Sequence, residues 1–546
     1  KGTKSKLLRS LKLVLHFAVA AAVFTFFAAC LIGLLNPGVA IAPADLGTLY
    51  LDLLNYYGPL WFVAVALVFF VVQFFAERRY PIGLFRPPTA VYILSFTLLV
   101  VAVVFYANYD YYYDFFAAAA RRRYLQALLL HFLVLLLGMV FVFVRSQRKK
   151  WLQALFLLLL LADGLAAFAL VTRWRPEPAP EVHWAAPVID PPRQVNILIL
   201  DGLSLNTLLG SAGEQKLLNL NWIRSNGVVG RFRTHRPNAD LSLLHTLLSG
   251  EPPGRSVPHS SARFRFHDVP LEFDVFPKYL VFRSSARLGK TFFYRRADAA
   301  PDDRIRGLYE HNGYAAFSML TPPAWPPYAG KNLKKNNAFV QFFSDTLENP
   351  DPKLDVLKKA FFYDDFLRKQ IPELKSSRFR YSLVRLGGLA SINARYYHYA
   401  RPENFGDLID AEQSRTYGWI LDRYYEFYDS VVGKIIGAMG DNELLLVLNL
   451  HEVMPMPVWR RILVNYLGRH DTYVYKPLRA PGVFLMYAKT ALKKGLYQEN
   501  VNLEDLFPTL LYYAGFPLGR SLQGEVVRDI FSDEFLAANP LYFTSE

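Results

Sequence analysis

Val195–Gly202 reads VNILILDG, a run of β-branched and leucine residues that stops at an acid and a glycine. Such a run predicts a buried strand of a parallel sheet. In open α/β sheets, ligands bind at the carboxyl ends of the strands. We therefore predict that Asp201 lies at a functional site and that the domain around it is built on this strand.

The first third of the 546-residue chain holds most of its hydrophobic excess; hydrophobic residues make up 53% of the whole. Stretches long and apolar enough to cross a bilayer are Leu11–Leu35, Leu60–Ala76, Val91–Asn108, Leu125–Val144 and Trp151–Val171. Four further spans follow the first one, so we interpret it as a membrane helix and not as a signal peptide.

The basic residues predict the orientation of these spans. The formal net charge is +15, and much of the excess flanks apolar stretches, for example RSQRKK at Arg145–Lys150. The loop Asn36–Asn55 has no Lys or Arg, and only the run Arg121–Arg123 departs from the pattern. The positive-inside rule then places the N-terminus in the cytoplasm and the C-terminal part outside. This charge pattern favours membrane anchoring over nucleic-acid binding.

The chain divides into three predicted parts. Residues 1–174 form a five-helix transmembrane domain, residues 175–194 a proline-rich linker, and residues 195–546 an extracytoplasmic domain. Cys30 is the only cysteine, which excludes disulfides and a cysteine-based zinc site. Inside the spans, Asp163 and His131 are almost the only ionisable residues, which argues against a transporter.

Strand-like and helix-like segments alternate in the outer domain, which predicts a parallel α/β sheet. Further strands are expected at Gly313–Met319, Glu443–Leu450 and Gly482–Tyr487, and a long polar helical stretch at Asn336–Ser391. The strand ELLLVLNL also ends in charged residues, His451 and Glu452.

The order of these segments resembles the alkaline phosphatase (sulfatase-like) superfamily, above all its type I phosphodiesterase/nucleotide pyrophosphatase branch. The motifs that carry the resemblance are ILDG, NLNWIRSNGV, TLLSGEPPGR, LYEHNGYAAFSMLTPPAWPP, YYEFYDSVVGKII with LLLVLNLHE, and EDLFPTLLYYAGFPLGRSLQG. Spans followed by such a domain are similar to lipoteichoic acid synthase and the phosphoethanolamine transferases. The resemblance implies a five-helix anchor with an alkaline-phosphatase-like α/β domain outside the membrane.

In this superfamily, two metal ions activate a Thr or Ser that attacks phosphorus. By resemblance, the nucleophile position falls on Asp240, which has no hydroxyl. Asp240 could instead bridge two metal ions while a metal-bound water attacks. Ser242 is a substitute nucleophile by residue type. The positions of the metal ligands fall on Asp201, Glu403, Asp407, His451, Glu452 and His470. A site so rich in oxygen ligands favours Mn²⁺ or Mg²⁺ over Zn²⁺.

Two neighbours of the nucleophile position are candidate substrate-binding residues. Asn238 could donate to a phosphate oxygen, with a helix cap as the alternative. Arg236 could bind an anionic headgroup, with a solvated strand face as the alternative.

The altered residues at the catalytic positions leave two candidate functions. The first is a metal-dependent phosphodiesterase or headgroup transferase that acts on a phospholipid or an envelope polymer, so that membrane lipids are its partners. The second is an inactive relative that has lost its metals and serves as a scaffold or binding subunit of a cell-envelope protein complex.

Overall fold

The structure is a computed structural model of the chain, and it describes most of residues 2–544. The parts outside the description are residues 80–88, 144–148, 177–183, 211–215, 252–261, 267, 281–291, 297–300, 321–327, 329, 347–350, 372–378, 467–472 and 478. The chain divides into two compact units. One unit is Lys1–Pro180 with Pro253–Ala300, and the other is Glu181–Pro252 with Pro301–Glu546.

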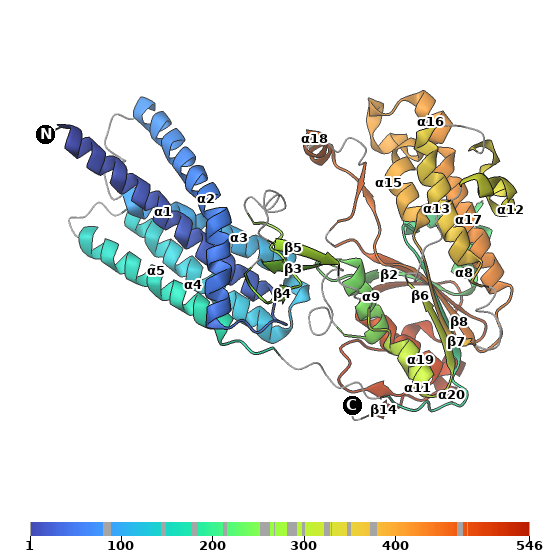
Figure 1. Ribbon diagram of the computed structural model, residues 1–546. Coiled ribbons are helices and arrows are strands. Elements are labelled where there is room, and N and C mark those ends of the chain that lie inside the picture. The colour runs from blue at the N-terminus through green and yellow to red at the C-terminus, as the bar shows by residue number, and fades with distance from the viewer. Residues whose placement is uncertain are drawn as a thin grey trace. The chain divides into compact units, whose positions relative to one another are not determined.

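The first unit is a bundle of long apolar helices (Figure 1). They are α1 (Gly2–Leu35), α2 (Pro43–Arg79), α3 (Thr89–Tyr111), α4 (Ala118–Phe143) and α5 (Lys149–Thr172). Among the described residues, four helical segments are long and apolar enough to cross a membrane. They are Leu11–Leu35, Pro43–Val72, Val91–Tyr111 and Gln153–Thr172.

Two details of this bundle differ from the prediction. The expected span Leu125–Val144 lies in α4 up to Phe143 but is not among the four candidate spans, so a fifth span is not established. In addition, α2 already begins at Pro43, inside the stretch Asn36–Asn55 that we expected to be a loop. Its first turn carries Pro43 and Asp45, residue types that favour the start of a helix.

The segment Pro253–Ala300 groups with the apolar helices and not with the sheet domain to which its sequence position had assigned it. It contains a small sheet of β3 (Ala262–Phe266), β4 (Glu272–Phe273) and β5 (Phe292–Arg296). Buried asparagines at the helix ends hold it: Asn36 exchanges two hydrogen bonds of 2.8 Å with the backbone of Val275. Asn108 accepts from the backbone of Lys278 at 2.7 Å.

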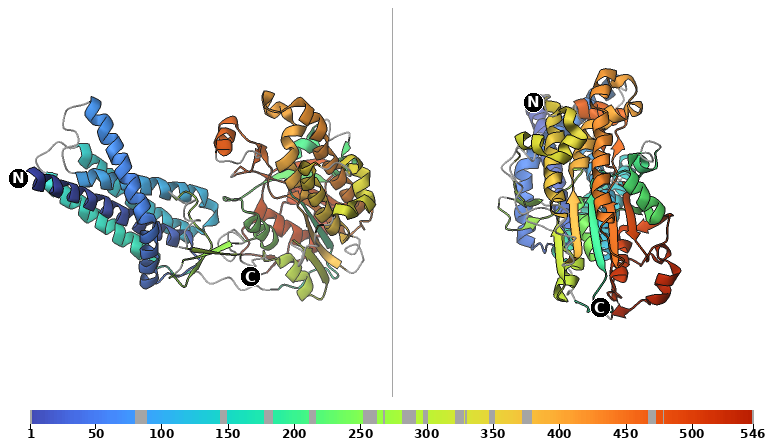
Figure 2. Two further views of the ribbon diagram at one scale, coloured as in Figure 1. Left: turned by 45° about the horizontal axis from the view of Figure 1, so that its top comes forward. Right: turned by 90° about the vertical axis from the view of Figure 1, so that its right-hand side faces the viewer.

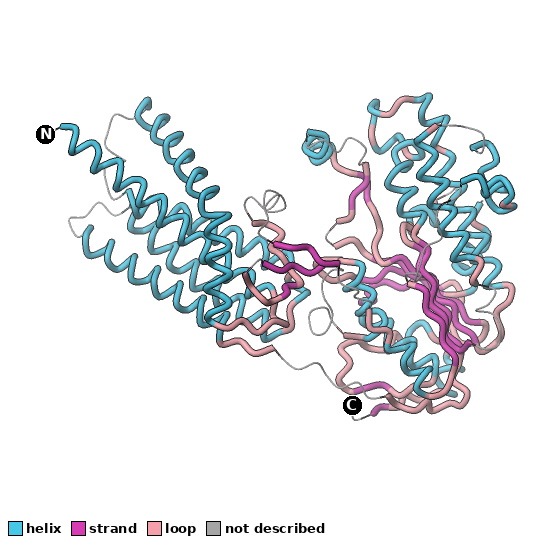
Figure 3. The backbone as a smooth tube through the Cα atoms, in the orientation of Figure 1, coloured by secondary structure: helices cyan, strands magenta, loops and turns pink. Residues whose placement is uncertain are grey.

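A seven-stranded mixed sheet forms the centre of the second unit (Figure 3). Its strand order is β12-β2-β11-β8-β1-β7-β6. The strands are β1 (Gln194–Leu200), β2 (Val228–Arg233), β6 (Ala315–Met319), β7 (Phe379–Leu386), β8 (Glu443–Asn449), β11 (Gly482–Ala488) and β12 (Leu496–Asn502). β1 pairs in parallel with β7 and β8, whereas β11 runs antiparallel to both β8 and β2. The sheet is therefore mixed, where we had predicted a parallel one.

Helices cover both faces of this sheet (Figures 1 and 2). Leu198 and Leu200 of β1 pack with one layer, and Val195, Ile197 and Ile199 pack with the other. The first layer contains α8 (Leu218–Asn226), α12 (Asn337–Phe343), α13 (Asp355–Arg368), α15 (Gly388–Ala400), α16 (Ala411–Tyr417) and α17 (Trp419–Ile436). The second contains α9 (Asp240–Ser249), α11 (Arg304–His311), α19 (Leu503–Ala514) and α20 (Asp533–Ala538). The alternation along β1 is the pattern of a strand buried on both faces.

The predicted helical stretch Asn336–Ser391 contains a strand. β7 occupies Phe379–Leu386 within it, next to β1 in the sheet. The strand reads FRYSLVRL, and its two arginines made the segment look like a solvated helix. The error matters because Arg385 lies at the carboxyl end of this strand.

Candidate functional site

The carboxyl ends of the parallel strands β1, β7 and β8 meet at one edge of the sheet, and charged side chains gather there. Asp201 directly follows β1, and His451 comes two residues after the end of β8. Asp240 is the first residue of α9. The chain turns sharply after β1, where Gly202 has a φ of +94°. A Cβ at Gly202 would lie 2.7 Å from a backbone nitrogen of α15, so only glycine fits this turn.

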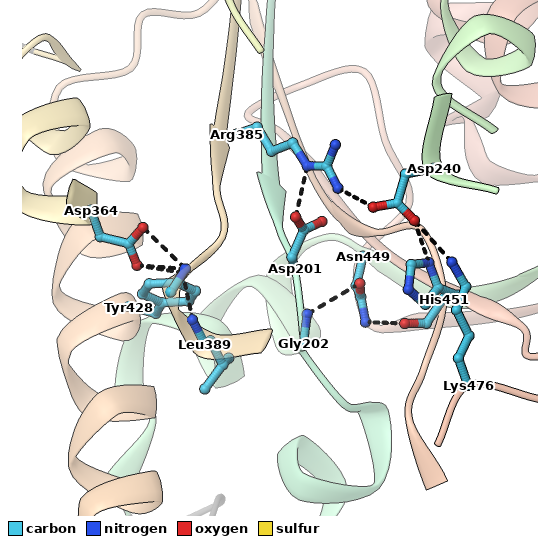
Figure 4. Close-up of polar contacts among 11 residues, drawn as sticks. Asp201, Gly202, Asp240, Asp364, Arg385, Leu389, Tyr428, Asn449, His451 and Lys476 are labelled. Atoms are coloured by element: carbon cyan, nitrogen blue, oxygen red, sulfur yellow. Dashed lines mark hydrogen bonds and ion pairs between the residues drawn. The ribbon is translucent and has the colours of Figure 1, made fainter. Parts of the chain in front are cut away.

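Arg385 bridges the two carboxylates (Figure 4). Its Nε donates to Asp201 at 2.7 Å, and its Nη2 donates to Asp240 at 2.5 Å. Because the two hydrogen bonds come from different nitrogens of one planar guanidinium, they hold both acids at a set separation. The Arg385 side chain is 18% exposed and that of Asp201 is 13% exposed, so this half of the bridge lies largely out of solvent, whereas Asp240 is 44% exposed.

A second cation, Lys476 from the loop before β11, also contacts Asp240. Lys476 Nζ donates to Asp240 Oδ1 at 2.9 Å. His451 Nδ1 lies 3.7 Å from the same oxygen, beyond hydrogen-bonding distance. Both oxygens of Asp240 thus face protein cations.

The charges in this group determine its protonation. Burial raises the pKa of Asp201, although Arg385 acts in the opposite direction. Burial also works against ionisation of Asp240, but Lys476 and Arg385 together hold its pKa below the usual range. For His451, burial and then the charge of Lys476 lower the pKa to about 3, so this imidazole is neutral at physiological pH. The group therefore contains balanced charges: one guanidinium and one ammonium against two carboxylates.

Asn449 and Asp364 support the turn from behind (Figure 4). Asn449 accepts from the backbone of Gly202 and donates to the carbonyl of His451 at 2.9 Å, which ties the ends of β1 and β8 together. The buried Asp364 accepts from the backbone of Gly388 at 3.1 Å and from two tyrosine hydroxyls, and burial raises its pKa to about 6. It anchors the start of α15, the helix that packs against Gly202.

The other predicted metal ligands are not gathered with these residues. Glu452 is buried, but its oxygens accept from Ser204 and from the backbone of Leu205 and face Arg231. Glu403 is exposed in the short 3₁₀ helix η5 (Pro402–Asn404). Asp407 lies in η6 (Gly406–Leu408), with its side chain outside the description. His470 lies outside the described residues.

The last three predicted site residues are Asn238, Arg236 and Ser242. Asn238 donates to the carbonyl of Pro477 at 2.7 Å and so holds the segment that carries Lys476. Arg236 precedes a cis peptide bond to Pro237. Ser242 is buried, and it is two positions after Asp240 on α9, so the two side chains point in different directions from the helix.

The described residues do not fit a two-metal centre. Among them, no three His, Cys, Asp or Glu side chains lie close enough together to hold a metal ion. Arg385 and Lys476 already neutralise the carboxylates that would bind the cations. A divalent ion near these acids would be repelled by two fixed positive charges, and the repulsion is strong where solvent is largely excluded.

Arg385 and Lys476 were not among the residues predicted from the sequence. The strand β7 would have offered one signal, because Arg385 is the penultimate residue of a strand next to β1 and thus lies at the ligand-binding edge. For Lys476, the sequence YKPLRAPG before β11 carries no comparable signal.

Comparisons with known proteins found similarity only among solved structures: no protein-family model and no curated protein sequence matches the chain. Murine ectonucleotide pyrophosphatase/phosphodiesterase 5 has a TM-score of 0.36 and 12% identity, and covers 62% of this chain and 100% of its own. The human protein has a TM-score of 0.36, 11% identity and the same coverage. A phosphonate monoester hydrolase from Silicibacter pomeroyi has a TM-score of 0.32 and 15% identity, and covers 62% of this chain and 76% of its own. These neighbours belong to the alkaline phosphatase superfamily.

Proposed function

We propose that this chain is a membrane-anchored relative of the alkaline phosphatase superfamily whose outer domain is a binding module, in which protein cations have replaced the metal ions. In this proposal the module is a non-catalytic subunit of a cell-envelope complex. The ordered motifs of the sequence and the α/β sheet with its charged carboxyl edge support the kinship. The apolar helices of the first unit support membrane anchoring.

One observation carries the non-catalytic assignment: Arg385 bridges Asp201 and Asp240, and Lys476 pairs with the second of these acids. Phosphodiester cleavage in the superfamily requires metal ions that neutralise charge developing on phosphorus and activate a nucleophile. Here the corresponding acids already have cationic partners, and an arginine or lysine cannot activate a hydroxyl as a metal does. Asp240, at the nucleophile position, has both oxygens engaged.

A second candidate function is the metal-dependent phosphodiesterase or headgroup transferase. Two atoms favour it: Asp201 Oδ1 and His451 Nδ1 are buried, and neither has a hydrogen-bond partner in the described part of the chain. Carboxylate oxygens and neutral imidazole nitrogens are metal-ligand types. A rearrangement that moved Arg385 and Lys476 away would be needed before these atoms could act together.

Metal content separates the two candidates. The full chain is purified in detergent without chelator, incubated with Mn²⁺ or Zn²⁺, desalted, and measured by elemental analysis, together with Asp201→Ala and His451→Ala. The matched control is Asp441→Ala, which removes a carboxylate that is 80% exposed in the same domain. We expect metal at background in all four proteins and no turnover of an activated phosphodiester. About two equivalents retained by the wild type and the control, but lost in the two site variants, would overturn the proposal.

The proposed topology follows from the sequence and is tested separately. Positive flanking charges favour a cytoplasmic N-terminus and an outer domain on the other side of a plasma (inner) membrane. Protease protection of the outer domain in inverted and in right-side-out membrane vesicles measures this directly. Digestion only in right-side-out vesicles is expected.

A further inference from the structure

The first unit has a groove of about 800 Å³ where α4 begins and α5 ends. Arg122 and Arg123 of α4 and Arg173, directly after α5, line it together with Trp174. Most of the remaining wall consists of alanines from these two helices. Two of these arginines belong to the basic run Arg121–Arg123, which departs from the charge pattern of the other helix ends and which the proposed function of the outer domain does not explain.

Arg123 is built into this end of the bundle. It is 5% exposed, and its Nη2 donates to the carbonyls of Gly33 and Leu34 at the C-terminus of α1, at 3.1 and 3.3 Å. Its guanidinium lies 4.4 Å from the centroid of the Trp174 ring. The Nε of this side chain is buried and has no hydrogen-bond partner among the described residues. The wall of the groove therefore contains a cation that is held in place by the helix bundle.

The other two arginines are exposed, and the described residues that line the groove include no acid. Three guanidinium groups at one groove without a carboxylate wall make a strongly positive site. Arginine is the side chain best suited to phosphate, because its planar fork donates two parallel hydrogen bonds. The first turn of α4 adds free backbone N–H groups and the positive end of a helix dipole.

The walls of the groove indicate which kind of phosphate compound it would bind. Small apolar side chains and an indole line the groove beside the arginines, so its surface combines a charged part with an apolar part. α5, which forms one wall, is long and apolar enough to cross a membrane. A lipid headgroup with its glycerol and upper acyl carbons matches this combination, whereas a free anion would contact only the charged part.

We propose that this groove binds the phosphate headgroup of an anionic phospholipid from the surrounding bilayer. The proposal concerns the membrane helices alone and stands whether or not the outer domain binds metal. It assigns a role to the exceptional arginines: they bind lipid at their end of the bundle instead of setting its orientation.

The test uses the full chain in neutral detergent, titrated with phosphatidylglycerol or with phosphatidylcholine and observed by native mass spectrometry. Arg122→Ala and Arg173→Ala remove exposed arginines of the groove. The matched control is Arg175→Ala, which removes another exposed charge two residues further on that does not line the groove. Thermal unfolding of each variant verifies that it is folded.

We expect wild type and Arg175→Ala to prefer phosphatidylglycerol, and each groove variant to bind it about fivefold more weakly, the effect of one basic residue near an anionic lipid. Equal binding of the two lipids by the wild type would overturn the proposal. An equal loss in Arg173→Ala and Arg175→Ala would also overturn it, because the attraction would then come from diffuse surface charge. Equal occupancy by inorganic phosphate at the same concentration would show a site for a free anion and would refute a lipid site.

Discussion

Replacing Arg385 with alanine should destabilise the second unit, the sheet domain, more than removal of any surface arginine, because it leaves two carboxylates without their shared cation. Loss of one partner from a fully buried pair costs about 3–5 kcal/mol. The Asp240 side chain is 44% exposed and keeps Lys476 as a partner, so solvent and the second cation reduce the penalty. We therefore expect about 2–3 kcal/mol, most of it from Asp201, whose side chain is only 13% exposed.

The assay is thermal unfolding of the full chain in detergent, monitored by circular dichroism. A loss of 2–3 kcal/mol corresponds to a decrease in Tm of about 3–5 °C, because the unfolding entropy grows with chain length and this unit is large. Arg423→Ala is the matched control, since Arg423 is 52% exposed and pairs with Glu426 on the surface of α17. Its Tm should change by about 1 °C, because exposed pairs contribute little.

The pH dependence of this deficit tests the physical reason. Burial raises the pKa of Asp201, and Arg385 opposes that effect; without Arg385 the pKa rises further. A carboxyl whose pKa is raised in the folded state favours folding at low pH and loses that contribution as the pH rises through its folded pKa. The deficit of Arg385→Ala relative to wild type should therefore shrink from pH 7.5 to pH 5.5. A deficit no larger than that of Arg423→Ala, or one that grows on acidification, would refute the reasoning.

Three further changes follow from single contacts, each measured by thermal unfolding. Gly202→Ala should lower the free energy of unfolding by about 2–4 kcal/mol, because it combines a positive φ with a backbone clash. Gly406→Ala, with φ of +61° and open space, should lower it by about 1 kcal/mol. Equal losses would contradict the packing argument. Asp364→Asn should become more stable relative to wild type as the pH rises from 4 to 7. The folded pKa of about 6 lies above the unfolded value, so ionisation costs the wild type stability in this range. An opposite trend would contradict the raised pKa of this buried acid. Asp163→Ala should lower the stability of the helix bundle by about 3–5 kcal/mol, because His131 Nδ1 loses its 2.7 Å partner. The double variant Asp163→Leu, His131→Leu should recover most of the lost stability. No recovery would argue against an isolated pair.

The sequence predicted the elements whose pattern is local. VNILILDG and ELLLVLNL are continuous apolar runs, and both became central strands, β1 and β8, with Asp201 and His451 close after their ends. Asp240, to which the resemblance assigned the nucleophile position, is the first residue of α9. The long apolar helices in the first third were also predicted from the sequence, because a helix that crosses a bilayer must be long and apolar, and both properties are local features of the sequence.

Long-range placement was decided only by the tertiary structure. Arg385 lies 184 residues from Asp201 and Lys476 lies 236 residues from Asp240, and no local pattern pairs them. The strand that carries Arg385 looked helical because its polar residues hid a short apolar alternation. The segment around Val275 packs with the apolar helices because two buried asparagines of the first unit accept hydrogen bonds from its backbone N–H groups. Hydrophobic periodicity depends on neighbouring residues, whereas the partner of a charge depends on which strand ends the fold brings together, and that choice separates a metal site from an ion-pair network.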